Sequence, residues 1–168
     1  NKNIDVGAIC GGNLGTVEEC FSTCTFRDFN VSISSSGWTN IGGVVGFNGG
    51  TVRNCYMVGS MDVSVQAGSG TNSVNVSGIV GKQDGSGAVL QNCYSVVSIR
   101  ANSNRPCYVG GVIGLLTGGN TCDNLYTNQD LCDTLLGSGS SSKFTNSALL
   151  STADMKSSAM VSKLGNAF

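Results

Sequence analysis

The chain is organised by a short hydrophobic pattern that recurs along its length. In each copy an apolar residue is followed by two small residues, two apolar residues and a glycine, as in residues 41–46 (IGGVVG). Copies begin at Val6, Ile41, Val76 and Val109, so that the steps between them are 35, 35 and 33 residues. Four copies at such even steps indicate a repeat architecture, in which each repeat forms the same supersecondary unit.

Each repeat contains three stretches that are predicted to be strands. In the second repeat they are the glycine-interrupted run 43–47, the run 51–58 that includes Asn-Cys-Tyr, and the alternating run 61–65. Alternation of apolar and polar residues at period two is typical of a half-buried strand. We therefore expect an all-β fold, a right-handed parallel β-solenoid of about four coils with three short strands each, over residues 1–136.

Stacked coils place equivalent residues above one another, which explains two features of the composition. Like charges in one column would repel, and only 11% of the residues are charged, whereas glycine occurs 25 times, often where corners are expected.

Cys20, Cys55 and Cys93 share one repeat position. We interpret them as a column of buried thiols, because free cysteine packs as a small hydrophobe. A disulfide between in-register neighbours is a sterically allowed alternative.

The last part of the chain, residues 137–168, departs from the repeat. Residues 137–142 (GSGSSS) have the composition of a flexible linker. After them, Ser151 is expected as a helix N-cap, with Asp154 three residues further on. Apolar residues at helical spacing continue to Leu164, and a glycine follows. We expect this helix to pack on the solenoid as part of the same domain and to cover its open end, which would protect edge strands.

The segments that join the repeats are variable and rich in serine, glycine and asparagine. They comprise residues 32–40, 66–72 and 101–106, and they occur at the same phase of each coil. Insertions in solenoids map to one edge, and that edge is frequently the one that binds a ligand. The candidate residues for a binding edge are Trp38, Gln66, Asn72, Asn102 and Arg105.

The composition narrows the chemistry of the chain considerably. It has no histidine, which excludes histidine-based catalytic triads and histidine-ligated metal sites. Its formal net charge of −1 gives no electrostatic basis for nucleic-acid binding. No apolar run of ~18 residues is present, so we expect no membrane insertion. The ten acidic residues are scattered, and we interpret Glu18, Arg53 and Asp123, near one column, as ion-pairing residues in preference to a glycosidase carboxylate pair. We expect no catalytic residue, metal or cofactor.

The eight cysteines include two in the least repetitive region, Cys122 and Cys132, which enclose nine residues. A bridge between them would hold the final coil, and they are our first candidates for a disulfide. No C-x-x-C spacing occurs, so a metal site built from thiols is disfavoured.

Residues 41–48 (IGGVVGFN), with Asn54-Cys55-Tyr56 downstream, resemble the GLUG-motif repeat family. The resemblance covers residues 6 to about 128 in four copies. That family occurs in bacterial surface and secreted proteins, including non-catalytic parts of immunoglobulin A peptidases and adhesins. The resemblance therefore implies an extracellular or cell-surface β-solenoid without catalytic residues.

These observations lead to three functional hypotheses. The first is a non-enzymatic surface or secreted module that binds a host protein or a glycan. The second is an accessory or spacer domain of a larger secreted peptidase or hydrolase, with other domains elsewhere in the parent polypeptide. The third is a carbohydrate-active β-helix enzyme, which the scattered acids disfavour. Gene context separates the first two, and depolymerisation of a uronate polymer would support the third.

Overall fold

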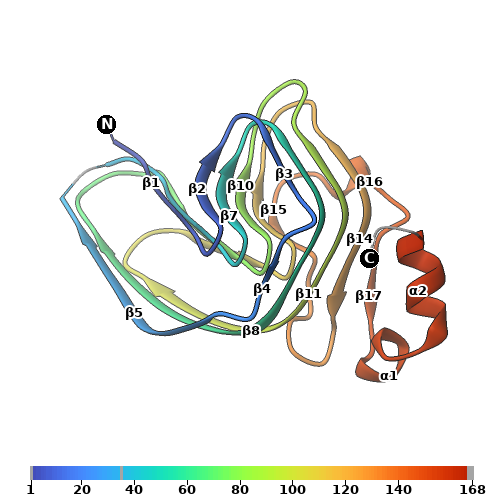
Figure 1. Ribbon diagram of the computed structural model, residues 1–168. Coiled ribbons are helices and arrows are strands. Elements are labelled where there is room, and N and C mark those ends of the chain that lie inside the picture. The colour runs from blue at the N-terminus through green and yellow to red at the C-terminus, as the bar shows by residue number, and fades with distance from the viewer. Residues whose placement is uncertain (1, 35, 166–168) are drawn as a thin grey trace.

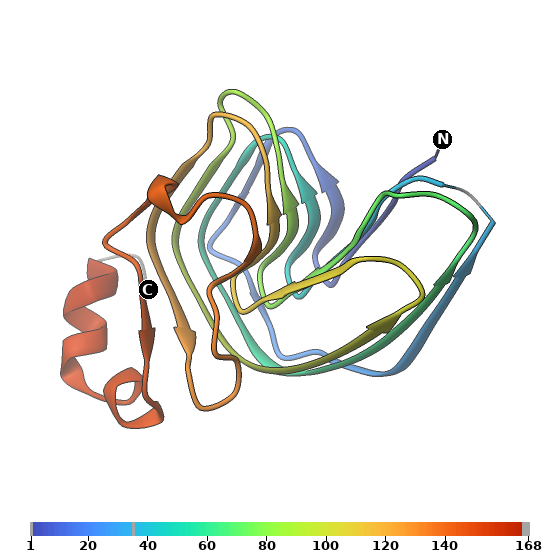
Figure 2. The ribbon, with the colours of Figure 1, turned by 180° about the vertical axis from the view of Figure 1, so that it is seen from behind.

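The protein is a parallel β-solenoid of about four coils with two short helices near its C-terminus. The computed structural model describes residues 2–34 and 36–165 of the 168-residue chain. In Figure 1 the coils follow one another from blue to orange with their equivalent strands side by side, and Figure 2 shows the same stack from behind. The all-β solenoid predicted from the sequence is confirmed.

The first of the three sheets contains the hydrophobic start of every repeat. Val6 pairs with Ile41, Ile41 with Val76, and Val76 with Val109, all in parallel. The steps in the sequence are therefore the lengths of the coils. Sheet 1 has the strand order β1 (Ile4–Gly7), β6 (Thr39–Gly42), β9 (Val74–Ser77), β12 (Cys107–Gly110).

Sheets 2 and 3 continue each coil after a sharp corner. Sheet 2 has the order β15 (Leu136–Ser138), β13 (Ile113–Leu116), β10 (Val80–Gln83), β7 (Val45–Asn48), β2 (Cys10–Asn13). Sheet 3 has the order β16 (Phe144–Thr145), β14 (Thr121–Asn128), β11 (Val89–Ser103), β8 (Thr51–Ala67), β3 (Thr16–Glu18), while β4 (Phe21–Ser22) and β5 (Thr25–Ile33) also pair with β8, and β17 (Ala148–Leu150) pairs with β14. Sheet 3 is the long curved wall that runs from β3 round to β5 in Figure 1.

A column of glycines lets sheets 1 and 2 approach closely behind the corner. A Cβ on Gly81 would lie 2.6 Å from the Ile41 nitrogen and 2.7 Å from the Gly46 oxygen. Gly114 and Gly137 stand at equivalent places against the backbone of the next sheet 1 strands. Because those contacts are to backbone atoms, no side chain can be accommodated without separating the sheets.

Asparagines make the bend in sheet 3. Asn54, Asn92 and Asn124 have φ values of 55°, 52° and 58°, a left-handed conformation that asparagine tolerates better than most residues. The amide of Asn92 donates to Asn54 (3.0 Å), and that of Asn124 donates to Asn92 (2.8 Å). The same residue type thus bends each coil and bonds it to its neighbour.

The interior is filled by the inward residues of all three sheets, mainly valine, isoleucine and leucine. One buried column is polar. The side-chain amide of Asn13 donates to the Asn48 side chain, and that of Asn48 donates to the Gln83 side chain, each at a distance of 2.8 Å. The column ends at Leu116, which pairs with Gln83 in the register and has no acceptor. Among the described residues, the Gln83 amide nitrogen is one of four buried side-chain atoms without a hydrogen-bond partner.

The C-terminal part corrects two expectations. Residues 137–142 are not a flexible linker: Leu136–Ser138 form β15, and Ser141–Lys143 form a 3₁₀ turn. The small residues are needed because Gly137 faces the Val109 backbone, with a Cβ position 2.6 Å from its nitrogen. With β16 and β17, this segment adds a partial fifth turn to sheets 2 and 3.

The predicted terminal helix is divided into α1 (Thr152–Met155) and α2 (Ser158–Leu164). Ser151 caps α1 as predicted, accepting from the Asp154 amide. The helix is interrupted at Ser157, whose backbone is extended (φ −84°, ψ 160°) and whose hydroxyl donates to the Asp154 carbonyl (2.7 Å). Met160 and Leu164 pack against Tyr126 on the outer side of sheet 3, so that the helices cover the flank of the last coil (Figure 1) instead of its end. In the described part of the chain, no helix has the length and apolar character required to cross a membrane.

Candidate functional site

The joining segments lie side by side at one edge, but most of the predicted binding residues are used to hold that edge together. Arg105 is only 7% exposed. Its guanidinium donates to the carbonyls of Gly37 (2.9 Å) and Gly68 (3.0 Å), which belong to two other segments. Arg105 thus stabilises the edge, because its donors satisfy backbone carbonyls that would otherwise be unpaired. A role of Arg105 in binding stays a prediction.

The other four predicted residues differ in exposure. Trp38 is half-buried, and the Lys82 ammonium lies 3.9 Å from its ring centre, in the geometry of a cation–π contact. Asn72 donates to the Ser36 carbonyl (2.8 Å). Gln66 and Asn102 are exposed. A binding role for this edge therefore depends on the last two residues, and it stays a prediction.

The predicted disulfide is not formed, and all eight cysteines are free thiols. Cys122 lies near the start of β14, whereas the Cys132 amide donates to Asn128, the last residue of that strand. Six residues of extended chain put on the order of 20 Å between the two ends, well beyond the ~7 Å limit for a bridge. Burial raises the pKa of Cys122 to about 12, as expected of an unreactive core thiol.

The acidic residues of the predicted column are in register. Glu18 pairs with Arg53 and Gln91 with Asp123, and Gln91 also pairs with Arg53. Arg53 contacts Glu18 at 2.5 Å, and both side chains are about half exposed, so that the pair contributes little stability. Among residues 2–34 and 36–165, no group of three or more histidine, cysteine or acidic side chains is placed to hold a metal ion.

Aromatic residues form another column on the outer side of sheet 3. Phe21 stacks on Tyr56 with centroids 5.2 Å apart, and Tyr56 stacks on Tyr94 at 4.9 Å, with interplanar angles of 8° and 6°. The ring faces are therefore occupied by the neighbouring rings. A row of this kind stabilises the stack, but it leaves no internal ring face on which a sugar could lie.

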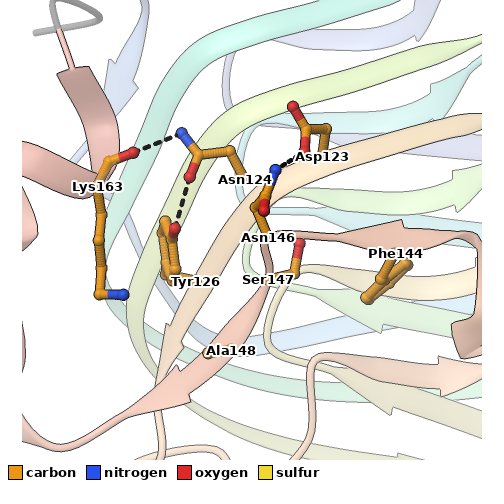
Figure 3. Close-up of a pocket in the computed structure, with 8 residues that line it drawn as sticks. All are labelled: Asp123, Asn124, Tyr126, Phe144, Asn146, Ser147, Ala148 and Lys163. Carbon is orange, nitrogen blue, oxygen red and sulfur yellow. Dashed lines mark hydrogen bonds between the residues drawn. The ribbon is translucent and has the colours of Figure 1, made fainter.

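The pocket drawn in Figure 3 is lined by side chains of several chemical kinds. It is open, has a volume of about 650 Å³, and lies between β14 and the partial fifth turn beside it. The fifth turn is held by parallel pairing of β16 and β17 with β14. The lining residues are Asp123, Asn124, Tyr126, Phe144, Asn146, Ser147, Ala148 and Lys163.

Asp123 provides the negative charge of the pocket. Its carboxylate accepts from the Thr145 hydroxyl (2.6 Å) and from the Asn146 amide (2.9 Å). These bonds, the first above all, lower the pKa of Asp123, which is therefore ionised at neutral pH. A third donor, Gln91 of the preceding coil, is 3.3 Å away. The carboxylate is held in one orientation before any ligand arrives.

Lys163 provides the positive charge from α2. Its backbone carbonyl accepts from the Asn124 amide (2.8 Å), which attaches the helix to the bend of the last coil. Its ammonium lies 5.7 Å from the centre of the Tyr126 ring, and the Tyr126 hydroxyl donates to Asn124 (2.5 Å). Figure 3 shows the lysine side chain running beside the tyrosine.

The pocket thus combines one carboxylate, one ammonium, two amides, a serine hydroxyl and two aromatic rings. The volume lies in the usual range for a small-molecule site. Such a set can both accept from and donate to a ligand. The lining of the pocket includes one carboxylate and no histidine.

Sequence reasoning placed Asp123 in a column but did not find this pocket. The signal was present in residues 144–148 (FTNSA), which repeat the order of residues 122–126 (CDNLY), with asparagine at the bend in both. Asn146 has φ 48° and stands where Asn124 stands one turn earlier.

Comparison of the chain with protein-family models, curated proteins and solved structures gives no match.

Proposed function

We propose that the protein is a non-enzymatic binding module for glycans, and that the pocket around Asp123 and Lys163 is its binding site. The observation that supports this is the mixed lining of the pocket, in which fixed acceptors and donors surround two aromatic side chains. A sugar hydroxyl both donates and accepts hydrogen bonds, so it suits a carboxylate on one side and an ammonium on the other. The C–H face of a sugar suits Phe144, which is partly exposed.

The charges favour a neutral or zwitterionic ligand over a strongly charged one. Asp123 and Lys163 compensate each other, and most other polar groups in the pocket are bonded within it. We expect weak binding of an individual site, because the pocket is open and each hydrogen bond to the ligand replaces one to water.

A glycan array followed by calorimetry tests the proposal. Lys163→Ala removes the ammonium but keeps the backbone carbonyl that bonds Asn124, and Asp123→Asn removes the charge with little change of volume. Each variant should weaken binding of an array hit at least tenfold. The matched controls Gln66→Ala and Asn102→Ala, at the other edge, should bind like the unmodified protein. Binding that is lost in the controls but kept in the pocket variants would reject the pocket and favour the joining edge.

A second candidate is a spacer or accessory domain of a larger secreted bacterial protein, located outside the cell. The observation that favours it is the use of amides and aromatic rings as columns that join each coil to the next. The GLUG-like pattern of residues 41–48 points in the same direction. No binding of any glycan or host protein on the arrays, together with peptidase motifs in the parent reading frame, would favour this candidate.

A further inference from the structure

The column of cysteines brings three thiols into contact across three coils. Cys55 pairs with Cys93 in the register of sheet 3. Cys20 stands opposite Cys55, because the next residues, Phe21 and Tyr56, are paired and the Tyr56 amide donates to the Cys20 carbonyl (3.1 Å). The column ends at Leu125, which pairs with Cys93.

Access to this column is graded from one end. Cys55 and Cys93 are fully buried, with 0% exposure. Cys20 is partly exposed, and Phe21 beside it is 56% exposed. A small oxidant that reaches the column from solvent therefore meets the Cys20 sulfur first, and Cys55 is the thiol behind it.

We propose that Cys20 and Cys55 are a peroxide-sensitive pair that closes reversibly to a disulfide. Neighbouring strands in a sheet are ~4.8 Å apart, which lies within the Cα separations of about 4.4–6.8 Å that disulfides span. Both residues flank the bend of sheet 3, where Glu19 and Asn54 have φ of 55°. The link would join the first coil to the second.

The chemistry balances with hydrogen peroxide as the oxidant. The Cys20 thiolate attacks one peroxide oxygen, so that an S–O bond forms, the O–O bond breaks and hydroxide leaves, giving a sulfenic acid. The Cys55 thiolate then attacks the Cys20 sulfur, so that an S–S bond forms, the S–O bond breaks and a second hydroxide leaves. The protons lost by the two thiols convert both hydroxides to water. Two thiols are oxidised and one peroxide is reduced.

The surroundings favour the second step and slow the first at neutral pH. A hydrogen bond with Cys93 lowers the pKa of Cys55, which favours the thiolate needed for the second step. Burial, together with the neighbouring Cys55, raises the pKa of Cys20. The first step therefore accelerates as pH rises towards and beyond 9.0, the ordinary value for the thiol.

Tryptic mapping after treatment with hydrogen peroxide tests the proposal directly. Cleavage at Lys2, Arg27, Arg53 and Lys82 separates peptide 3–27, which carries Cys20, from peptide 54–82, which carries Cys55. We expect a cross-linked pair of these peptides that is 2 Da lighter than their sum and is removed by dithiothreitol. Fragmentation identifies Cys20, since peptide 3–27 also holds two other cysteines.

Matched variants make the result decisive. Cys20→Ser should reduce the cross-linked pair at least tenfold, whereas Cys24→Ser, four residues away and exposed, should leave it unchanged. In the unmodified native protein, iodoacetamide should label Cys20 before Cys55 and thereby block the link. The proposal is overturned by oxidation of Cys20 to sulfinic acid without a link, by a link to another cysteine, or by unchanged thiols after exposure to peroxide.

Discussion

Replacing Gly81 with alanine tests whether the close approach of sheets 1 and 2 is essential to the fold. The added Cβ would meet the Ile41 nitrogen at 2.6 Å and the Gly46 oxygen at 2.7 Å, about 0.8 Å short of ordinary contact, which begins near 3.4 Å. The Ile41 nitrogen belongs to β6 of sheet 1, and the Gly46 oxygen belongs to β7, the strand beside Gly81 in sheet 2. Both strands are paired on either side, so neither atom can move singly. Sheet 1 has to move away locally, and the pairing of β7 with β10 has to be disturbed.

The cost follows from the packing around this position. Val80 and Ile79 are fully buried beside Gly81, and a gap of 0.5–1 Å in such a core loses about a quarter to a half of the dispersion energy of each contact. Overpacked core substitutions cost roughly 1–3 kcal/mol, and backbone on both sides places this one at the upper end, about 3 kcal/mol or more. That is a large part of the roughly 5–15 kcal/mol that stabilises a domain.

Urea unfolding followed by circular dichroism measures the effect, with Gly87→Ala as the matched control. A Cβ on Gly87 would meet no atom within 4 Å, and its backbone does not require glycine. We expect Gly87→Ala to leave the free energy of unfolding unchanged or to raise it by up to about 1 kcal/mol, since alanine reduces the freedom of the unfolded chain. Equal stabilities of the two variants would refute the close approach of the sheets.

Three further changes address other parts of the molecule. Arg105→Met should lower the free energy of unfolding by about 3 kcal/mol, because buried carbonyls lose their donor, whereas Arg100→Met at an exposed site should change it by less than about 0.5 kcal/mol in the same urea titration. Asp123→Asn should be less stable than the unmodified protein at neutral pH. Since the folded pKa of Asp123 is depressed, its contribution is complete above the ordinary value of 3.8 and is lost as pH falls through the lower folded value, so thermal melts of the two proteins should converge in acid. Leu116→Gln supplies an acceptor for the unpaired Gln83 amide, and a double-mutant cycle with Gln83→Leu should give a favourable coupling of about 1 kcal/mol; zero coupling would contradict the continuation of the column.

The coils could be predicted from the sequence because every repeat presents the same residues to the same surroundings. The pairing of Val6, Ile41, Val76 and Val109 follows directly from their spacing. The partial fifth turn could not be predicted in this way, because it lacks a sheet 1 strand and its spacing to the fourth is shorter. Gly137 shows the difficulty. The composition of residues 137–142 indicates a linker, yet the small size of Gly137 is required by the backbone of Val109.

The candidate site was harder to predict than the fold for a related reason. Asp123 belongs to a repeat position, so its column was evident. Its partners Thr145 and Asn146 come from the partial fifth turn, and Lys163 comes from α2. Contacts of this kind depend on where a helix packs, which spacing does not reveal. Arg105 shows a different difficulty at the joining edge, since it has the residue type of a ligand contact but donates to the backbone of neighbouring segments.

The columns also determine which substitutions depend on one another. Side chains that bond across coils are separated by 35 residues at Asn13 and Asn48, by 38 at Asn54 and Asn92, and by 32 at Asn92 and Asn124. A change at one of these positions alters the environment one coil away while its sequence neighbours point elsewhere. As the chain diverges, compensating changes should therefore accumulate at these long intervals, leaving an evolutionary record of the winding in the sequences themselves.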